Sequence, residues 1–193
     1  MMPQTARPSE CRGSAVEFLH HAVDGALHQA AVFEAGGQAF GAQAAAYERG
    51  RPSYPPEAID WLLPDGARDV LDLGAGTGKL TRSLVGRGLG VIAVEPSPGM
   101  RRAFRHALPD VTVVGGAAER LPLPDACAGA VVAAQAWHWV DPALAGPEAA
   151  RVLRPAGVLG LVWNDRDERD PWVAALSSLL HEYGTSPDAG YRP

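Results

Sequence analysis

The chain has 193 residues, of which 47% are hydrophobic and 20% are charged, and its formal net charge is −5. This length and composition suit one ordinary globular domain, and the acidic balance offers no footprint for a nucleic-acid partner or an anionic membrane surface. Cys11 and Cys127 have neither disulfide-framework nor zinc-ligand spacing, so we expect a reducing, cytoplasmic setting, with no membrane contact and no metal.

Two regions are expected along the chain. Residues 1–39 read as a separate extension, because apolar side chains recur at helical spacing over 16–30. Residues 40–193 read as one domain. It begins with the polar and aromatic segment YERGRPSY at 47–54, whose prolines favour turn or extended geometry, and a short helix follows over 56–63.

Strands and helices then alternate. Buried-type strands are expected at 69–73, 91–94, 111–114, 130–134 and 158–163, and helices at 79–85, 100–107, 147–153 and 171–183. Apolar strands separated by helices are typical of a parallel sheet that is covered on both faces. We therefore predict an α/β fold with a doubly wound parallel sheet of five strands. Its ligand is expected beyond the carboxyl ends of the strands, where the strand order reverses.

The first predicted strand runs into a glycine-rich turn directly before a helix. The turn consists of Gly74, Ala75, Gly76, Thr77 and Gly78. Glycines there permit positive φ and let a ligand approach the backbone closely. A phosphate-binding loop is excluded, because Leu73 and Leu80 occupy its required Gly and Ser/Thr positions. A dinucleotide fingerprint is excluded as well, because Lys79 or Thr81 stands at its third glycine.

The pattern that remains is Asp-x-Gly-x-Gly-x-Gly, which starts at Asp72. It resembles the first motif of class I S-adenosylmethionine-dependent methyltransferases, which implies a Rossmann-like sheet and S-adenosyl-L-methionine as the cofactor. An acidic residue beside the turn suits a cofactor that carries an ammonium and a sulfonium group. Glu95 ends the second strand about 20 residues after the turn, where an acid is expected to bind ribose hydroxyls.

The resemblance implies further cofactor contacts. Together they are Asp72, Gly74, Ala75, Gly76, Thr77, Gly78, Glu95, Pro96, Ser97, Met100, Ala118, Glu119 and Gln135. Pro96, Ser97 and Met100 are expected beside the adenine. Ala117 stands where the family often has an aspartate that accepts from the adenine amino group, so that contact passes to the backbone or to Glu119 in this interpretation.

A run AQAWHW at 134–139 ends the fourth strand and resembles a small-molecule branch of the same family, as do YERGRP at 47–52 and LRPAG at 153–157. His138 is the candidate general base, because its pKa ordinarily falls near working pH. The alternative is a histidine that only shapes the pocket wall. The expected substrate pocket comprises Tyr47, Arg49, Arg51, Tyr54, Trp137 and Trp139. The resemblance implies that the first four form a flap over the site, although the two arginines could equally form a solvated face.

The family completes its sheet with an antiparallel pair of strands, and residues 184–193 are too polar and rich in Pro and Gly to supply one. We therefore expect a C-terminally incomplete domain whose fifth strand is an apolar edge that can self-associate. The leading hypothesis is methyl transfer to a small-molecule acceptor at O, N or C. The alternatives are a cofactor-binding module without turnover and, disfavoured by the missing fingerprint, a nicotinamide-dependent oxidoreductase.

Overall fold

The computed structural model describes residues 52–182. The chain divides into two units, Met1–Val162 and Trp163–Pro193. The expected extension over 1–39, its boundary at residue 40 and the flap residues Tyr47, Arg49 and Arg51 lie outside the described residues. Within 52–182, no helix is long and apolar enough to cross a membrane, and no cluster of His, Cys, Asp or Glu is arranged to hold a metal ion.

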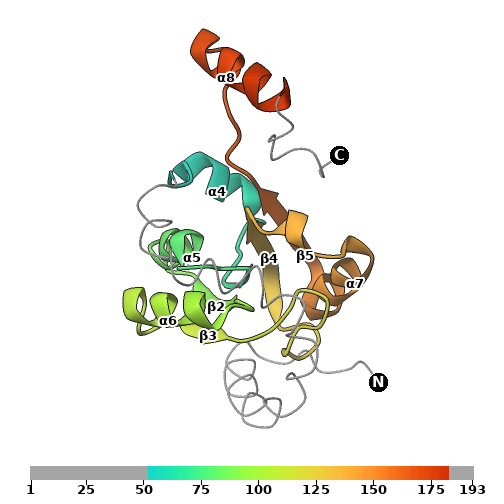
Figure 1. The fold of residues 1–193 in the computed structure, drawn as a ribbon. Helices are drawn as coiled ribbons and strands as arrows, with labels where there is room; N and C mark the ends of the chain where they lie inside the picture. The colour runs from blue at the N-terminus through green and yellow to red at the C-terminus, as the bar shows by residue number, and fades with distance from the viewer. Residues whose placement is uncertain (1–51, 183–193) are drawn as a thin grey trace, which may run out of the picture. The chain divides into compact units, whose positions relative to one another are not determined.

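The first unit is built on a sheet of five strands. They are β1 (Asp69–Leu73), β2 (Gly90–Val94), β3 (Thr112–Val114), β4 (Ala128–Ala134) and β5 (Leu153–Val162). Their order is β3-β2-β1-β4-β5, and every neighbouring pair is parallel (Figure 1). The order reverses between β1 and β4, so a crevice is expected beyond the carboxyl ends of these two strands. The predicted α/β, Rossmann-like parallel sheet is confirmed.

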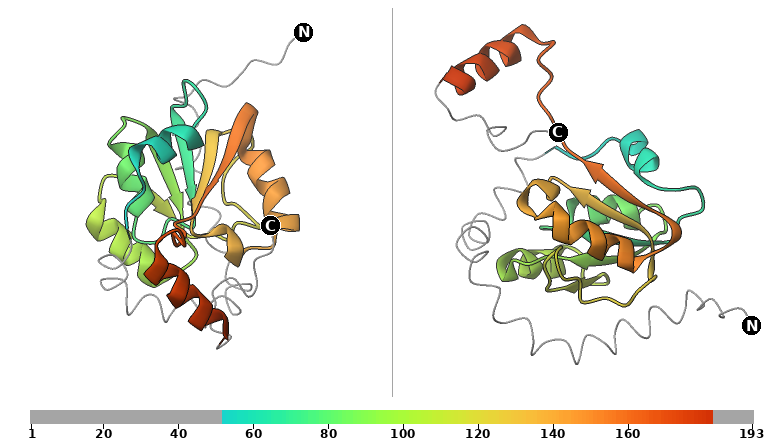
Figure 2. Two further views of the ribbon diagram at one scale, coloured as in Figure 1. Left: turned by 90° about the horizontal axis from the view of Figure 1, so that it is seen from above. Right: turned by 90° about the vertical axis from the view of Figure 1, so that its right-hand side faces the viewer.

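Helices cover both faces of the sheet. The first unit contains α4 (Pro56–Leu62), α5 (Lys79–Val85), α6 (Pro98–Ala107) and α7 (Pro142–Val152), and the second unit contains α8 (Pro171–Glu182). One face packs against α4, α5 and α6, and the other against α7 and the segment 115–127 (Figure 2). Side chains alternate along β1 accordingly: Val70 belongs to the core of α4 and α5, whereas Leu71 and Leu73 belong to that of α7.

The contact between α4 and β5 depends on a glycine. A Cβ atom at Gly160 would lie 2.9 Å from the Leu62 carbonyl oxygen and 3.0 Å from Leu62 Cδ2. Leu62 itself is buried, so the helix has no room to move outward without exposing its own core side chain. Glycine at position 160 thus lets α4 pack directly against β5.

The structure corrects the predicted start of the helix before β5. The prediction placed this helix at 147–153, but α7 begins at Pro142, after Asp141, whose carboxylate accepts a hydrogen bond of 2.9 Å from the Ala143 amide. An Asp N-cap followed by Pro is a helix-start signal that outweighs the later Pro147, which lies inside the helix. The bounds of β1 and α5 match the prediction, and those of the other described elements that were predicted differ from it by one or two residues, except at β5.

The strand β5 is also longer than predicted and irregular. Leu153 pairs with Ala128, whereas Val158 pairs with Ala130, so the residues between Leu153 and Val158 bulge out of the ladder. Ala156 in this bulge has a φ of 64°. The predicted strand at 158–163 therefore corresponds to the regular part of β5.

Candidate functional site

The glycine-rich turn lies at the carboxyl end of β1, against the end of β2. The amides of Gly74 and Ala75 both donate to the Val94 carbonyl oxygen, at 2.8 and 3.1 Å. Gly74 has a φ of 69°, and a Cβ atom there would lie 2.5 Å from Ala136 Cβ. Gly76 has a φ of 57°, and a Cβ atom there would meet nothing within 4 Å. Gly74 therefore permits packing against the end of β4, whereas Gly76 leaves open space beside the turn.

A pocket lies beside this turn. Its walls are formed by Tyr54, Asp72, Gly74, Ala75, Gly76, Thr77, Lys79, Leu80 and Ala134. The predicted flap residue Tyr54 is buried and lines this pocket, as do four of the five predicted turn residues, Gly74, Ala75, Gly76 and Thr77. Lys79 and Leu80 entered the sequence argument only as residues that break other motifs, and Ala134 only as the end of a strand. The pocket combines one carboxyl group with one ammonium group, which suits a ligand that carries both charges.

Asp72 is the last residue but one of β1, lines the pocket and is 1% exposed. Its Oδ2 accepts a hydrogen bond of 2.5 Å from the Thr81 hydroxyl, which projects from α5. Burial raises the pKa of Asp72 to about 7; the Thr81 hydrogen bond opposes this rise, and the charge of Glu95 adds to it. The group therefore titrates near neutral pH, and a bound cation would favour its charged form.

Glu95 directly follows β2 and is 6% exposed. Its Oε2 accepts a hydrogen bond of 2.9 Å from the Gly76 amide, and its Oε1 accepts one of 2.8 Å from the Ser97 amide. Burial raises the pKa of Glu95, whereas the two amide hydrogen bonds and the positive charge of Arg101 lower it. A carboxylate oxygen has two lone pairs, so both oxygens retain the capacity to accept from a ligand. Glu95 thus joins the β1 turn to the β2 end and still offers acceptors.

The residues after Glu95 begin helix α6. The Ser97 hydroxyl accepts a hydrogen bond of 3.4 Å from the Met100 amide and caps the helix. Ser97 and Met100 are buried, whereas Pro96 is exposed. These residues were predicted beside the adenine; in the structure the Ser97 amide donates to Glu95 and the Met100 amide donates to the Ser97 hydroxyl.

The loop after β3 covers 115–127 and contains Ala118 and Glu119, which were predicted as cofactor contacts. Ala118 is buried in the core under α7. Glu119 Oε1 accepts a hydrogen bond of 2.9 Å from the Asp141 amide, so this carboxylate connects the loop to the start of α7. The sequence suggested Glu119 as a cofactor contact, and the structure gives one of its oxygens a different partner.

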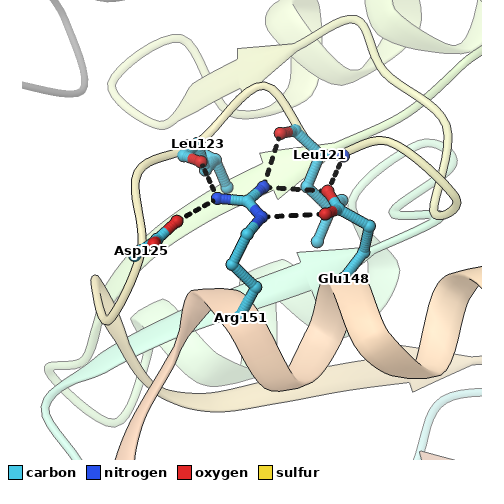
Figure 3. Close-up of polar contacts among 5 residues, drawn as sticks. All are labelled: Leu121, Leu123, Asp125, Glu148 and Arg151. Carbon is cyan, nitrogen blue, oxygen red and sulfur yellow. Dashed lines mark hydrogen bonds and ion pairs between the residues drawn. The ribbon is translucent and has the colours of Figure 1, made fainter.

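A charged network anchors the second half of this loop to α7 (Figure 3). Arg151 donates to the carbonyl oxygens of Leu121 and Leu123 at 3.0 and 2.8 Å, and to Asp125 Oδ1 at 2.7 Å. It also donates to both oxygens of Glu148 at 2.8 Å, and Glu148 Oε2 accepts from the Leu121 amide at 2.8 Å. The Arg151 hydrogen bond is the main reason why the pKa of Glu148 is lowered. Only the i, i+3 spacing of Glu148 and Arg151 hinted at this pair in the sequence.

The end of β4 carries the predicted catalytic run. Gln135 is half-buried, has a φ of 55°, and donates its amide to the Val162 carbonyl oxygen at 2.9 Å. The short 3₁₀ helix η2 (Trp137–Trp139) follows, with His138 exposed and Trp139 60% exposed. The rings of His138 and Trp139 lie 4.9 Å apart at 47°. Of this run, only Ala134 is among the residues that line the described pocket.

Comparisons with known proteins agree with the motif. A family model for the methyltransferase domain matches residues 71–161. An uncharacterized methyltransferase of Mycobacterium tuberculosis is 63% identical over 145 residues, which cover 75% of this chain and 60% of that protein. An uncharacterized methyltransferase-like protein of Schizosaccharomyces pombe is 40% identical over 149 residues, covering 75% and 58%. The chain thus spans about 60% of the length of these relatives.

This chain covers a larger share of one solved structure than of these two relatives. An S-adenosylmethionine-dependent methyltransferase of Thermotoga maritima, described as a possible histamine N-methyltransferase, is 31% identical to this chain. The alignment covers 77% of this chain and 67% of that protein, with a TM-score of 0.55.

Proposed function

The chain belongs to the S-adenosylmethionine-dependent methyltransferases, and we propose that it transfers the methyl group of S-adenosyl-L-methionine to a small-molecule acceptor. The observation that carries this proposal is the position of Glu95 at the end of β2. Its carboxylate is oriented by the Gly76 and Ser97 amides and lies next to the pocket that contains Asp72. A carboxylate held in this way can accept from both hydroxyls of a ribose.

The residues of the pocket fit the cofactor in chemistry and space. The open side of Gly76 leaves room for a ligand to approach the backbone. Asp72 would face the cationic amino-acid end of the cofactor, and Lys79 on the same pocket wall would complement its carboxylate. The bound cofactor would supply a methyl group on a sulfonium, whose carbon–sulfur bond breaks as the acceptor bonds to the methyl carbon. The contribution of the protein is chiefly to align the two reactants.

His138 remains our candidate for the general base that takes a proton from the acceptor. It is exposed on η2, at the carboxyl end of β4, which is the strand next to the cofactor turn. This position leaves the imidazole accessible to an acceptor that enters from solvent. Trp137 and Trp139 would then form the surrounding wall, and Tyr47, Arg49 and Arg51 of the predicted flap would complete it.

The class of acceptor is proposed from charge and from similarity. The net charge of −5 disfavours a polyanionic acceptor such as a nucleic acid, and the similar Thermotoga maritima protein is described as a possible histamine N-methyltransferase. A small molecule accessible in the cytoplasm is therefore our proposed acceptor. A module that holds the cofactor without turnover is the second candidate, since Glu95 and Asp72 alone would support binding.

Calorimetric titration tests the cofactor site directly. We expect the chain to bind S-adenosylmethionine and its demethylated product S-adenosylhomocysteine, but not NADH. Glu95→Gln keeps the side-chain shape and removes its charge, so it should weaken both interactions by about ten-fold to a hundred-fold. NADH binding, or an unchanged affinity in Glu95→Gln, would contradict the proposed site. Binding without transfer to any of a panel of small amines, alcohols and carbon acids would favour the second candidate.

A further inference from the structure

The arginine that follows the Ser97 cap makes two contacts behind the proposed ribose site. Arg101 lies in the first turn of α6, where its amide donates to the Ser97 carbonyl oxygen at 3.0 Å. Its guanidinium Nη1 donates to the carbonyl oxygens of Glu95 and Pro96, at 2.7 and 2.6 Å. The guanidinium therefore connects α6 to the turn that precedes it, and it fixes the backbone from which the Glu95 side chain projects.

The other side of the same guanidinium touches the start of the loop after β3. A Cβ atom at Gly115 would lie 3.1 Å from Arg101 Cζ and 3.3 Å from each of its Nη atoms. Even an alanine would have to displace the guanidinium by a few tenths of an ångström. Gly115 thus lets the arginine lie between the β2 turn and the β3 loop, and in contact with both.

These two segments are neighbours at the edge of the sheet where the ligand is expected. The pocket lies at the end of β1, Glu95 directly follows β2, and Gly115 directly follows β3. These three strands are adjacent in the order β1, β2, β3. A nucleoside whose ribose binds Glu95 would reach from the pocket toward the β3 loop. The separation of the β2 turn from that loop then decides whether ribose and base can be held together.

We propose that Arg101 is a positioning residue, which holds the Glu95 turn and the Gly115 loop at the separation that an adenosine group requires. This inference rests on the proposed function, because it assigns Glu95 to the ribose. Arg101 itself needs no contact with the cofactor. It acts through the two backbone segments that it joins, and through its charge on Glu95.

The charge gives the proposal a signature that simple loss of structure would not produce. Among the described residues, the charged groups that face Glu95 are Asp72 from β1 and Arg101 from α6. Arg102 and Arg105 in turn act on Arg101, whose own pKa is lowered chiefly by burial. Because Arg101 lowers the pKa of Glu95, its removal would keep Glu95 protonated to a higher pH, where it accepts ligand hydroxyls less well.

The first test is the affinity for S-adenosylhomocysteine from about pH 5 to about pH 8 in four proteins: the unaltered chain, Arg101→Met, Gly115→Ala and the double variant. Each single change should weaken binding by about ten-fold at neutral pH, which corresponds to the loss of a hydrogen bond to a charged group. The double variant should be little worse than Arg101→Met alone, since both changes disturb one contact. The acidic limb of the profile should move to higher pH in Arg101→Met and stay in place in Gly115→Ala.

Two controls keep these outcomes interpretable. Arg102→Met removes an exposed arginine of the same helix and should bind as the unaltered chain does. Titration of the Glu95 carboxyl carbon by NMR, without ligand, should show a raised pKa in Arg101→Met alone. Affinity that is unchanged in Arg101→Met, or reduced equally at every pH with additive effects, would overturn the positioning role. Failure of the unaltered chain to bind would instead overturn the proposed function, and the NMR titration would still report the contact between Arg101 and Glu95.

Discussion

Burial favours the neutral form of both Asp72 and Glu95, whereas the proposed ligand contacts require their charged forms. Glu95 has two amide donors and a nearby arginine to stabilise its charge, whereas Asp72 is hydrogen-bonded by the hydroxyl and the backbone of Thr81, and the charge of Glu95 opposes its ionisation. A buried carboxylate with so little compensation costs free energy when it is ionised. In the function that we propose, the cationic end of the cofactor would offset this cost when it binds next to Asp72.

The variant Asp72→Asn tests whether ionisation of Asp72 lowers the stability of the ligand-free protein. The folded protein holds the Asp72 proton up to about pH 7, against an ordinary value of 3.8, so ionisation destabilises the fold progressively as pH rises between these values. The variant cannot ionise, so above pH 7 it should be more stable than the unaltered chain by on the order of 2–4 kcal/mol. Denaturant unfolding should show this gain at about pH 8 and a much smaller one at about pH 5. S-adenosylmethionine should nevertheless bind the variant less tightly.

A gain of the same size at both pH values would mean that the Asp72 charge does not limit stability. The asparagine side chain of the variant keeps an amide oxygen that can accept from the Thr81 hydroxyl, so the comparison isolates ionisation from hydrogen bonding.

Gly74 shows the second constraint at this scale, which is steric. Alanine there would adopt a φ of 69° and bring its Cβ to 2.5 Å from Ala136 Cβ. The matched control is Gly66→Ala, with a φ of 74° and no atom within 4 Å of the added Cβ. We expect Gly66→Ala to cost roughly 1–2 kcal/mol of unfolding free energy from backbone strain alone, and Gly74→Ala to cost about 1–3 kcal/mol more. Equal costs in denaturant titrations would show that the turn and Ala136 move apart freely.

At the scale of elements, the loop after β3 is held between a strand end and a helix. Arg101 touches its start, Glu119 connects it to Asp141, and Arg151 binds its second half. These are contacts with backbone groups of segments that are distant in sequence. The loop is therefore ordered by its neighbours in addition to its own turn, in which the Arg120 amide donates to the Ala117 carbonyl oxygen at 3.2 Å.

Arg151→Met should release that loop from α7. It removes a guanidinium whose hydrogen bonds reach Leu121, Leu123, Asp125 and Glu148. We expect a loss on the order of 2 kcal/mol in unfolding free energy, reduced below a fully buried value because the side chain is 31% exposed. Amide hydrogen exchange should accelerate at 115–127 more than in β1. The control is Arg169→Met, whose ion pair with Asp167 is exposed and should contribute little.

At the scale of the molecule, the sheet order leaves β5 as the last strand among the described residues. We expect the chain to self-associate through this edge at high concentration, because unpaired strand edges template further pairing. Val158→Lys places a charge on the edge strand, and Val85→Lys places one on α5; both valines are 38% exposed. Sedimentation should show association that Val158→Lys reduces and Val85→Lys does not. A monomer at all concentrations would contradict this role of β5.

The sequence by itself determined the fold class and, through the resemblance of the Asp72–Gly78 pattern to a known family, the cofactor. Alternation of apolar strands with helices admits few arrangements, and three glycines at fixed spacing after an aspartate are needed where the chain must take positive φ beside a ligand. Glu95 could be found in the same way, because a strand end has a defined place relative to that turn. These signals are local, so they can be read along the chain.

The tertiary structure decided which charges act on the site. Three sets of hydrogen bonds depend on how the elements pack, because they join residues of different elements. They are the bond from Thr81 to Asp72, the bond from Arg101 to the backbone after β2, and the Arg151 network. It also placed Lys79 on the pocket wall, gave Glu119 the Asp141 amide as a partner and left His138 exposed. Desolvation is a property of the packed molecule, so the raised pKa of Asp72 has no counterpart in the sequence.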